Sequence, residues 1–268
     1  MARNTFRAPS WLIDAHRPVE TTVIGAGGTG GEVLDQLCRL HATLTALGHA
    51  GLTVTLFDGD TVSPANVGRQ RFSTLEVGQN KAVSLINRIN LFYGLNWRAI
   101  PFHWQSQDPM GRLLITATDS AALRHKVARS ERSDGFQYQQ DADLWLDFGN
   151  GQHDGQAVLG HRARSQRPSG REELRLPHII DLYPDMADDP DAGPSCSVEA
   201  AIRQQAFGIN SALVTNAFAS LIWPLFRHGH IDRHGLFIDV ATGQMTPLHI
   251  DPTEWAMLGY TSSYRMAS

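Results

Sequence analysis

The chain has 268 residues, a length that fits one large domain or two small ones. Its net charge of −4 gives no overall attraction to nucleic acid or to an anionic membrane, and we expect neither as a partner. Two cysteines are too few for a four-cysteine zinc site or a disulfide framework. No apolar run has the length of a membrane span, and the N-terminal residues lack the apolar core of a signal peptide. We therefore expect a cytoplasmic protein.

The first part of the chain alternates strand and helix patterns around a glycine-rich turn. Residues 1–18 mix charge, proline and aromatic side chains, as an arm leading into a fold does. Residues 21–24 and 52–57 are apolar and β-branched, and the leucines between them recur at three- and four-residue spacing. This order of strand, glycine turn, helix and strand predicts a right-handed βαβ unit with parallel strands.

Later segments extend this unit. The patterns predict helices over 78–92 and around 123–127, and strands over 97–102, 113–117, 144–148 and 157–160, of which the last two form an antiparallel pair. Residues 161–194 are rich in Arg, Pro and Asp, which predicts a long surface loop. A helix over 197–226, bent near Gly208, and a hairpin over 236–250 follow.

These elements predict one Rossmann-like, doubly wound α/β domain, with a mainly parallel sheet and antiparallel C-terminal strands. We see no internal repeat that would suggest a second unit. The expected parts are an N-terminal arm (1–18), a core (19–160), a crossover loop (161–195) and a C-terminal helix with its hairpin (196–268).

Three glycines mark the turn after the first predicted strand. Gly25 permits the tight turn, Gly27 lets the backbone approach a ligand, and Gly30 lets the helix pack on the strand. The start of that helix then offers free N–H groups to a phosphate. The motif indicates a nucleotide without identifying it, and the alternative is a packing turn with no ligand.

Two acids follow the second predicted strand. Asp58 falls at the strand end, where an acid commonly accepts hydrogen bonds from ribose hydroxyls, a role that suits NAD and ATP equally. Asp60 would share the face of Asp58 if the strand continued, and would otherwise serve as a turn or cap residue.

Two cations and a third acid favour phosphate chemistry. Arg69 offers a planar fork and Lys81 a compact charge, both suited to phosphate oxygens. Hydride transfer develops no phosphate charge, so this pair favours a reaction that expels pyrophosphate, unless both are ordinary surface cations. Asp119 ends a strand at the ligand-binding edge of the sheet, where it could hold Mg²⁺, cap the next helix, or do both.

The two cysteines differ in setting. Cys196 lies between the predicted loop and a helix, and a helix N-terminus lowers the pKa of a thiol, as a nucleophile that takes an acyl group from an acyl-adenylate requires. The alternative for Cys196 is a small buried residue. Cys38 lies among leucines and is expected in the core. The histidines show no metal-ligand spacing, and the basic run 162–171 lacks the aromatics that stack on bases.

Taken together, the motifs resemble the ThiF/MoeB/HesA family of adenylyltransferases related to ubiquitin-activating enzymes. The resemblance rests on GAGGTG, DGDTVSPANVGRQ, VGQNKA and ATDS, in this order and spacing over residues 21–120. Later segments, LWLDFGNG and PSCSVEAAIRQQ, are most similar to the ThiF-like members of the PRTRC plasmid cassettes.

The resemblance implies adenylation of the C-terminal glycine carboxylate of a ubiquitin-like protein by a homodimeric enzyme that uses ATP with Mg²⁺ and releases pyrophosphate. It implies that Asp58 holds the ribose, that Asp119 binds Mg²⁺, and that Cys196 accepts the acyl group if a thioester forms. The nucleotide would further be bound by Gly25, Gly27, Gly28, Gly30 and Asp60, with Asn66, Arg69, Gln70 and Lys81 around its phosphates.

The chain also departs from the family pattern. The paired CxxC zinc motifs are absent, and Ser120 stands where asparagine is usual after the magnesium-site aspartate. The family's dimer donates an N-terminal arginine to the partner's ATP site, and the candidates here, Arg3 and Arg7, do not have the matching spacing.

Two other functions compete with adenylation. An NAD-dependent oxidoreductase would need a catalytic acid or base over a nicotinamide pocket, and the sequence offers no such group. The second competing function is that of a non-catalytic module of the same fold, which would recruit a ubiquitin-like or plasmid-maintenance partner. The presence of Arg69, Lys81 and Asp119 argues against a module that has lost its catalytic activity.

Overall fold

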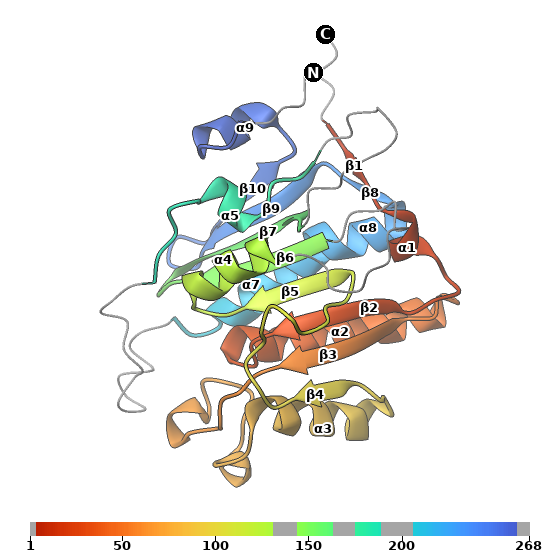
Figure 1. The fold of residues 1–268 in the computed structure, drawn as a ribbon, viewed down its shortest axis with the longest axis vertical. Coiled ribbons are helices and arrows are strands. Elements are labelled where there is room, and N and C mark those ends of the chain that lie inside the picture. Colours follow the sequence, from red (N-terminus) through yellow and green to blue (C-terminus); the bar gives the residue numbers. More distant parts are fainter. Residues whose placement is uncertain (1–3, 131–143, 163–174, 189–205, 262–268) are drawn as a thin grey trace.

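The fold is an eight-stranded mixed sheet with helices on both faces, seen here in a computed structural model (Figure 1). The structure describes residues 4–130, 144–162, 175–188 and 206–261. Strand order is β10-β9-β7-β6-β5-β2-β3-β4. The pairs from β6 to β4 are parallel and those from β6 to β10 are antiparallel. The strands are β2 (Val19–Ile24), β3 (Leu52–Phe57), β4 (Arg98–Ile100), β5 (Leu113–Ala117), β6 (Leu144–Asn150), β7 (Asp154–His161), β9 (Arg233–Asp239) and β10 (Gln244–His249).

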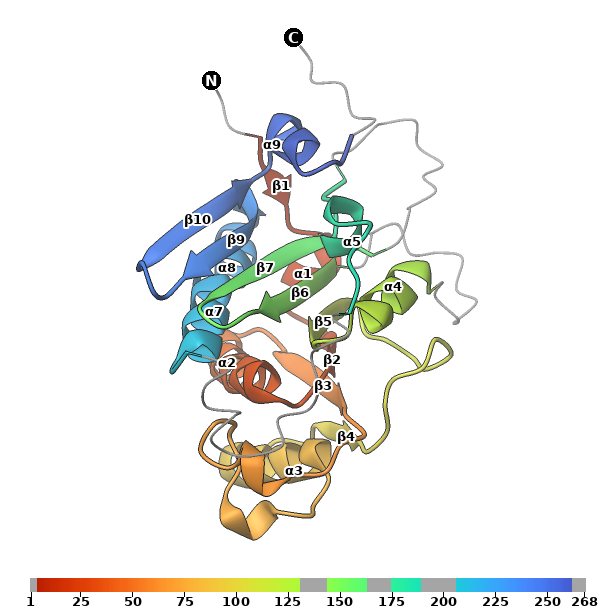
Figure 2. The ribbon, with the colours of Figure 1, turned by 90° about the vertical axis from the view of Figure 1, so that its left-hand side faces the viewer.

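Helices cover the two faces unequally. The helices α2 (Gly28–Ala46), α7 (Ile209–Ala217) and α8 (Trp223–His228) lie on one face, and α4 (Ala121–Arg129) with the short α5 (Ile179–Leu182) lies on the other (Figure 2). The helix α3 (Lys81–Tyr93) connects β3 to β4. This arrangement confirms the predicted doubly wound α/β domain. The sequence patterns did not indicate β8 (His230–Ile231) or α9 (Pro252–Met257).

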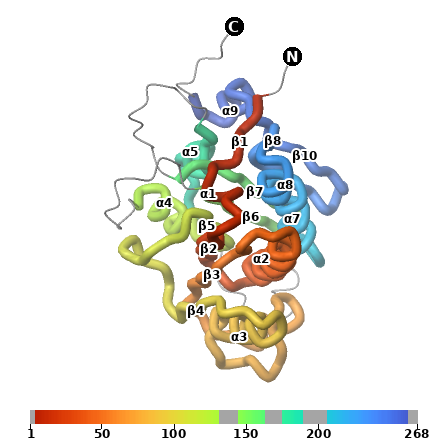
Figure 3. Tube along the Cα trace, turned by 90° about the vertical axis from the view of Figure 1, so that its right-hand side faces the viewer, coloured from red at the N-terminus to blue at the C-terminus, as the bar shows by residue number. Residues whose placement is uncertain are grey.

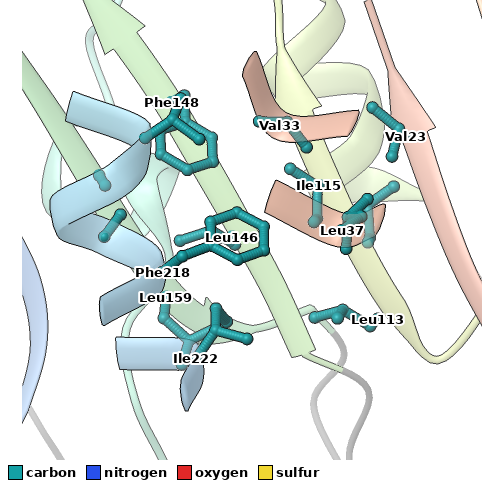
Figure 4. Close-up of a cluster of buried hydrophobic side chains, with 14 of the residues drawn as sticks. Val23, Val33, Leu37, Leu113, Ile115, Leu146, Phe148, Leu159, Phe218 and Ile222 are labelled. Carbon is teal, nitrogen blue, oxygen red and sulfur yellow. The ribbon is translucent and has the colours of Figure 1, made fainter. Parts of the chain in front are cut away.

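The core forms where the central strands meet the helices. All five residues of β5 are buried, as expected of a strand covered on both faces. Leu113 and Ile115 of β5 lie near Leu37 of α2, and Leu146 of β6 lies near Phe218 (Figure 4). Burying one such side chain stabilises the fold by about 1.5–3 kcal/mol, so this layer holds the strand ends in place.

The N-terminal arm packs into the fold. The strand β1 (Phe6–Arg7) pairs with β8 through Phe6 with Ile231 and Arg7 with His230, and the short helix α1 (Ser10–Ile13) follows (Figure 3). Leu12 is buried in the main core. The backbone of Arg7 is therefore engaged within its own chain, and Arg3 lies outside the described residues.

Two expectations for the second half of the chain were wrong in part. The bend near Gly208 is the start of a helix, because Gly208 takes a left-handed φ of +81° and α7 begins at the next residue. The predicted surface loop is packed over 175–188, where Leu176, Ile179 and Leu182 are buried. The rest of that loop and residues 197–205 lie outside the described residues.

The expectation that no apolar run has the length of a membrane span was wrong, because the helical run Ile209–His228 is long and apolar enough to cross a membrane by length and composition alone. Its fully buried side chains, which include Leu213, Leu221 and Leu225, belong to the main core. A π-helical turn at Phe218–Ile222 precedes α8, whose first turn holds a proline. Proline has no N–H for the α-helical ladder, and the wider turn accommodates that loss.

A buried ion pair joins α4 to the sheet. Arg124 Nε lies 2.9 Å from Asp147 Oδ1, and its Nη2 donates to the carbonyl oxygens of Thr118 and Phe148 at 2.7 and 2.8 Å. Thr116 also donates to Asp147, and Trp145 Nε1 donates to Thr116 at 2.7 Å. Burial raises the pKa of Asp147, and the charge of Arg124 opposes that shift.

Asp147→Asn should lower the free energy of unfolding by about 3–5 kcal/mol, because it leaves the buried guanidinium of Arg124 without a counter-charge. Urea denaturation measures the change. Arg39→Ala is the control, since Arg39 pairs with Asp35 on the surface of α2 with a side chain 67% exposed. That pair should contribute less than about 1 kcal/mol. Equal effects of the two substitutions would contradict a central role for the buried pair.

A second buried polar contact involves His234. Its Nδ1 lies 2.8 Å from Leu159 O, and its Nε2 accepts from Trp255 Nε1 at 2.7 Å. This arrangement needs the neutral tautomer that carries the proton on Nδ1, because a second proton on Nε2 would face the indole N–H. Burial accordingly lowers the pKa of His234 to about 4.

The free energy of unfolding should fall as the pH drops from 6.5 toward 4, because only the unfolded chain then protonates His234. The contribution is on the order of 3 kcal/mol. His234→Gln keeps a donor and an acceptor but does not titrate, so its stability deficit should shrink over this range. Denaturation at several pH values measures both proteins, and parallel pH profiles would contradict the expectation.

Candidate functional site

A cleft of about 910 Å³ lies at the carboxyl ends of the parallel strands. Residues at or after the carboxyl ends of β2, β3, β4 and β5 and residues at the end of β6 line it, together with Gln156 of β7 and the starts of α2, α3, α4 and α7. Open α/β sheets bind ligands at this edge. Nine of the twelve predicted site residues line this one cleft: Gly25, Gly27, Gly28, Asp58, Asp60, Arg69, Gln70, Lys81 and Asp119. Gly30 packs beneath the glycine turn.

The glycine turn has no room for side chains. Gly25 has a φ of +103°, and a Cβ on it would lie 2.3 Å from Ala117 O. A Cβ on Gly30 would lie 2.0 Å from Gly25 O, so Gly30 is a packing glycine, as predicted. The helix α2 begins at Gly28 after Gly27, which supplies no side-chain cap, and its first N–H groups are therefore available to an anion.

Asp58 holds two turns together. Its Oδ2 accepts from the N–H of Ala26 at 2.6 Å, and its Oδ1 accepts from the N–H of Asp60 at 2.8 Å. Burial raises its pKa, and these two hydrogen bonds work against that shift. Asp58 thus joins the glycine turn to the end of β3, in addition to facing the cleft where a ribose would lie.

Lys81 is already paired. Its Nζ lies 3.0 Å from Asp60 Oδ2, and His103 Nε2 lies 3.7 Å from the other oxygen of Asp60. The strand β3 ends at Phe57, so Asp60 belongs to the turn, which was the alternative to its lying on the strand. Asn80 caps α3 with its Oδ1 and donates to the carbonyl of Asp58, which places Lys81 at the cleft.

Arg69 and Gln70 present unpaired polar atoms. Within the described residues, Arg69 Nε and Gln70 Oε1 are buried and have no hydrogen-bond partner, and both residues line the cleft. An unpaired buried group costs about 1–3 kcal/mol, so these atoms suit a bound polar ligand. Asn66 does not reach the cleft. Its Oδ1 accepts from Ser63 N at 2.9 Å and caps a short turn, which corrects its expected place around the phosphates.

Asp119 is exposed in the cleft, two residues after β5. The side chain of Ser120 caps α4 by accepting from Leu123 N at 3.2 Å, so the alternative role of Asp119 as the helix cap was wrong. The described residues contain no group of three or more His, Cys, Asp or Glu side chains arranged around a metal. Mg²⁺ at Asp119 would therefore depend on nucleotide phosphates and water for its other ligands, which is its usual coordination.

Several cleft residues were not foreseen from sequence. Thr29 Oγ1 donates to Asn210 Oδ1 at 2.8 Å, and Asn150 Nδ2 donates to the same oxygen at 3.0 Å. Asp188, which is not among the residues that line the cleft, accepts hydrogen bonds from the N–H groups of Ala121 and Ala122 at the start of α4. These contacts join positions far apart in the chain.

The structure tests the prediction for only one of the two cysteines. Cys38 is buried in α2, and burial raises its pKa to about 12, which confirms its place in the core. Cys196 lies outside the described residues.

Comparison with known proteins places part of the chain in a family. Residues 13–131 match the ThiF family. A search of the curated proteins found no match.

Solved structures share the fold over most of the chain. The crystal structure of PaaA has 14% identity and a TM-score of 0.54, covering 90% of this chain and 66% of PaaA. MccB from E. coli has 14% identity and a TM-score of 0.56, covering 90% of this chain and 65% of MccB. A structure of E. coli MccB with ATP has 16% identity and a TM-score of 0.53, covering 90% of this chain and 66% of that chain. This chain thus spans about two thirds of the length of the structures it matches. Residues 13–131, which form strands β2 to β5 of the Rossmann-like sheet, thus match the ThiF family.

Proposed function

We propose that this protein adenylates the C-terminal glycine carboxylate of a ubiquitin-like protein, using ATP and releasing pyrophosphate. The observation that carries the proposal is the convergence, in one cleft, of a glycine cradle, the unpaired polar atoms of Arg69 and Gln70, and the exposed carboxylate of Asp119. A structure of E. coli MccB, which has a similar fold, contains ATP. These features suit a nucleoside triphosphate better than an uncharged ligand.

The residues along the cleft suggest distinct roles in binding the nucleotide and in the reaction. The N–H groups at the start of α2 would bind phosphate oxygens, and Arg69 with Lys81 would offset the negative charge that grows on the leaving pyrophosphate. Mg²⁺ at Asp119 would neutralise further phosphate charge. The substrate carboxylate would attack the α-phosphorus as the bond to the pyrophosphate oxygen breaks. Positioning and electrostatics are sufficient for such a transfer.

A polypeptide tail fits the other part of the cleft. The side chains of Asn150, Gln156 and Asn210 line it, and amides can both donate to and accept from an extended backbone. Structures of E. coli MccB contain a partner, MccA, which supports a peptide or protein as the substrate class. The proposed enzyme acts as a homodimer in the cytoplasm.

A non-catalytic module is the second candidate. Two observations favour it: Lys81 is paired with Asp60, and Asn66 caps a turn instead of facing the cleft. Such a module would bind a ubiquitin-like or plasmid-maintenance partner, in keeping with the resemblance to the PRTRC cassettes, without forming an adenylate.

Exchange of labelled pyrophosphate into ATP tests the enzymatic proposal. It should require the cognate ubiquitin-like protein and fall at least 100-fold in Arg69→Ala and in Asp119→Ala, because each removes charge compensation in the transition state. Arg71→Ala is the matched control and should remain near wild type, since Arg71 pairs with Glu32 and Asp35 away from the cleft.

Three outcomes separate the candidates. Exchange that survives both substitutions would contradict the assigned site. ATP binding without exchange, in the presence of a bound partner, would favour the module. Loss of exchange in Arg71→Ala as well would point to damage of the fold, which thermal denaturation of the three variants would reveal.

The thioester is a separate prediction. If Cys196 accepts the activated acyl group, a DTT-sensitive adduct with the ubiquitin-like protein should form, and Cys196→Ala should abolish it while pyrophosphate exchange persists. Cys38→Ala should retain the adduct, because Cys38 is buried in the core. Gel electrophoresis without reductant measures the adduct, and an adduct that forms without Cys196 would contradict the prediction.

A further inference from the structure

The segment after β4 brings a buried indole to the cleft. His103, Trp104 and Gln105 all line the cleft, and the Trp104 side chain is only 1% exposed. Its Nε1 is buried and has no hydrogen-bond partner within the described residues. An indole nitrogen is a donor only, so this N–H requires an acceptor. An unpaired buried donor costs about 1–3 kcal/mol, and an acceptor on a bound ligand would remove that cost.

The contacts around Trp104 hold the ring in place. Lys126 Nζ lies 5.9 Å from the ring centroid, and it also donates to Gln105 Oε1. The N–H of Gln105 donates to Asp108 Oδ2 at 2.7 Å, and the N–H of Asp108 donates back to the carbonyl of Gln105 at 2.9 Å. These hydrogen bonds fix the segment that follows the indole, and the ring itself is packed in the hydrophobic core.

Strand order indicates which part of a nucleotide would lie there. The glycine turn follows β2, Asp58 follows β3, and the Trp104 segment follows β4, in the spatial order β2-β3-β4. The N–H of Asp58 donates to Ile100 O at 3.2 Å, and a Cβ on Gly59 would lie 2.7 Å from the His103 ring, so the segment adjoins the turn that holds Asp58. With phosphates at the glycine turn and ribose at Asp58, the base falls at the end of β4.

We propose that the indole N–H of Trp104 donates a hydrogen bond to a ring nitrogen of the purine base, making Trp104 a specificity-determining residue of the nucleotide site. This inference rests on the proposed function. A ring-nitrogen acceptor satisfies the buried donor, whereas a carbon at the same position leaves it unpaired. A site with a buried donor discriminates against ligands that lack the matching acceptor.

Binding of ATP and its deaza analogues tests the assignment in the full chain. Calorimetry would compare ATP with 1-deaza-, 3-deaza- and 7-deaza-ATP, each of which replaces one ring nitrogen by carbon. One analogue should bind the wild type about tenfold more weakly than ATP, and Trp104→Phe should bind ATP and that analogue equally, at the weaker affinity. The wild-type comparison remains informative even if Trp104→Phe folds poorly.

Trp11→Phe is the matched control. Trp11 Nε1 is also buried without a partner within the described residues, but Trp11 lines a separate cavity of about 530 Å³ near the start of β2. Its substitution should leave ATP binding unchanged. A parallel titration with inorganic tripolyphosphate should show no difference between wild type and Trp104→Phe.

Each contrary outcome identifies what has failed. If the wild type does not bind ATP, the proposed function fails. If it binds ATP and all three analogues alike, or if Trp104→Phe weakens tripolyphosphate as much as ATP, the base assignment alone is overturned.

Discussion

The pairing of Arg124 with Asp147 is the interaction on which the arrangement of the cleft depends. A charge buried between a helix and a sheet is stable only when fully compensated, and here the carboxylate, two carbonyl oxygens and a threonine hydroxyl complete the network. Because the carbonyls belong to Thr118 and Phe148, the same network fixes the ends of β5 and β6 relative to α4. Asp119 follows Thr118 and Asn150 lies two residues after Phe148, so the same network also positions these two side chains.

On the other side of β2, the single carboxylate of Asp58 also holds two segments of the cleft together. It spans the glycine turn and the turn after β3 through two backbone N–H groups, and so fixes these two turns relative to each other. Among the described residues, three of the buried polar atoms without a hydrogen-bond partner belong to side chains that line the cleft, Arg69, Gln70 and Trp104, whereas others, such as Trp11 Nε1, lie elsewhere. Buried polar groups are usually paired in a folded protein, and a ligand in the cleft would supply partners for these three atoms.

How well the sequence predicts a feature of this structure depends on how far apart along the chain the interacting residues lie. The strands β3 and β5 were predicted at their observed limits, because an apolar β-branched run bounded by glycine or aspartate is a local signal. Arg124 lies in the helix predicted around 123–127, and its role could not be foreseen because its partner, Asp147, lies 23 positions away. Asn66 matched a motif, yet its amide caps the turn that contains it, since a side chain near a turn can bond to the local backbone. Trp104 lies in a segment without helical or strand periodicity, and its burial follows from tertiary packing alone.

The ion pair between Lys81 and Asp60 has a consequence for binding. Both carboxylate oxygens of Asp60 face a basic side chain, and the Asp60 side chain is 54% exposed. The Lys81 side chain is only 11% exposed, so water screens this pair less than it screens a surface pair, and the ammonium group needs a counter-charge. Asn80 keeps the backbone of Lys81 in place by capping α3. In the proposed enzyme a phosphate oxygen would replace Asp60 as that counter-charge, so a paired lysine is compatible with the proposed phosphate-binding role.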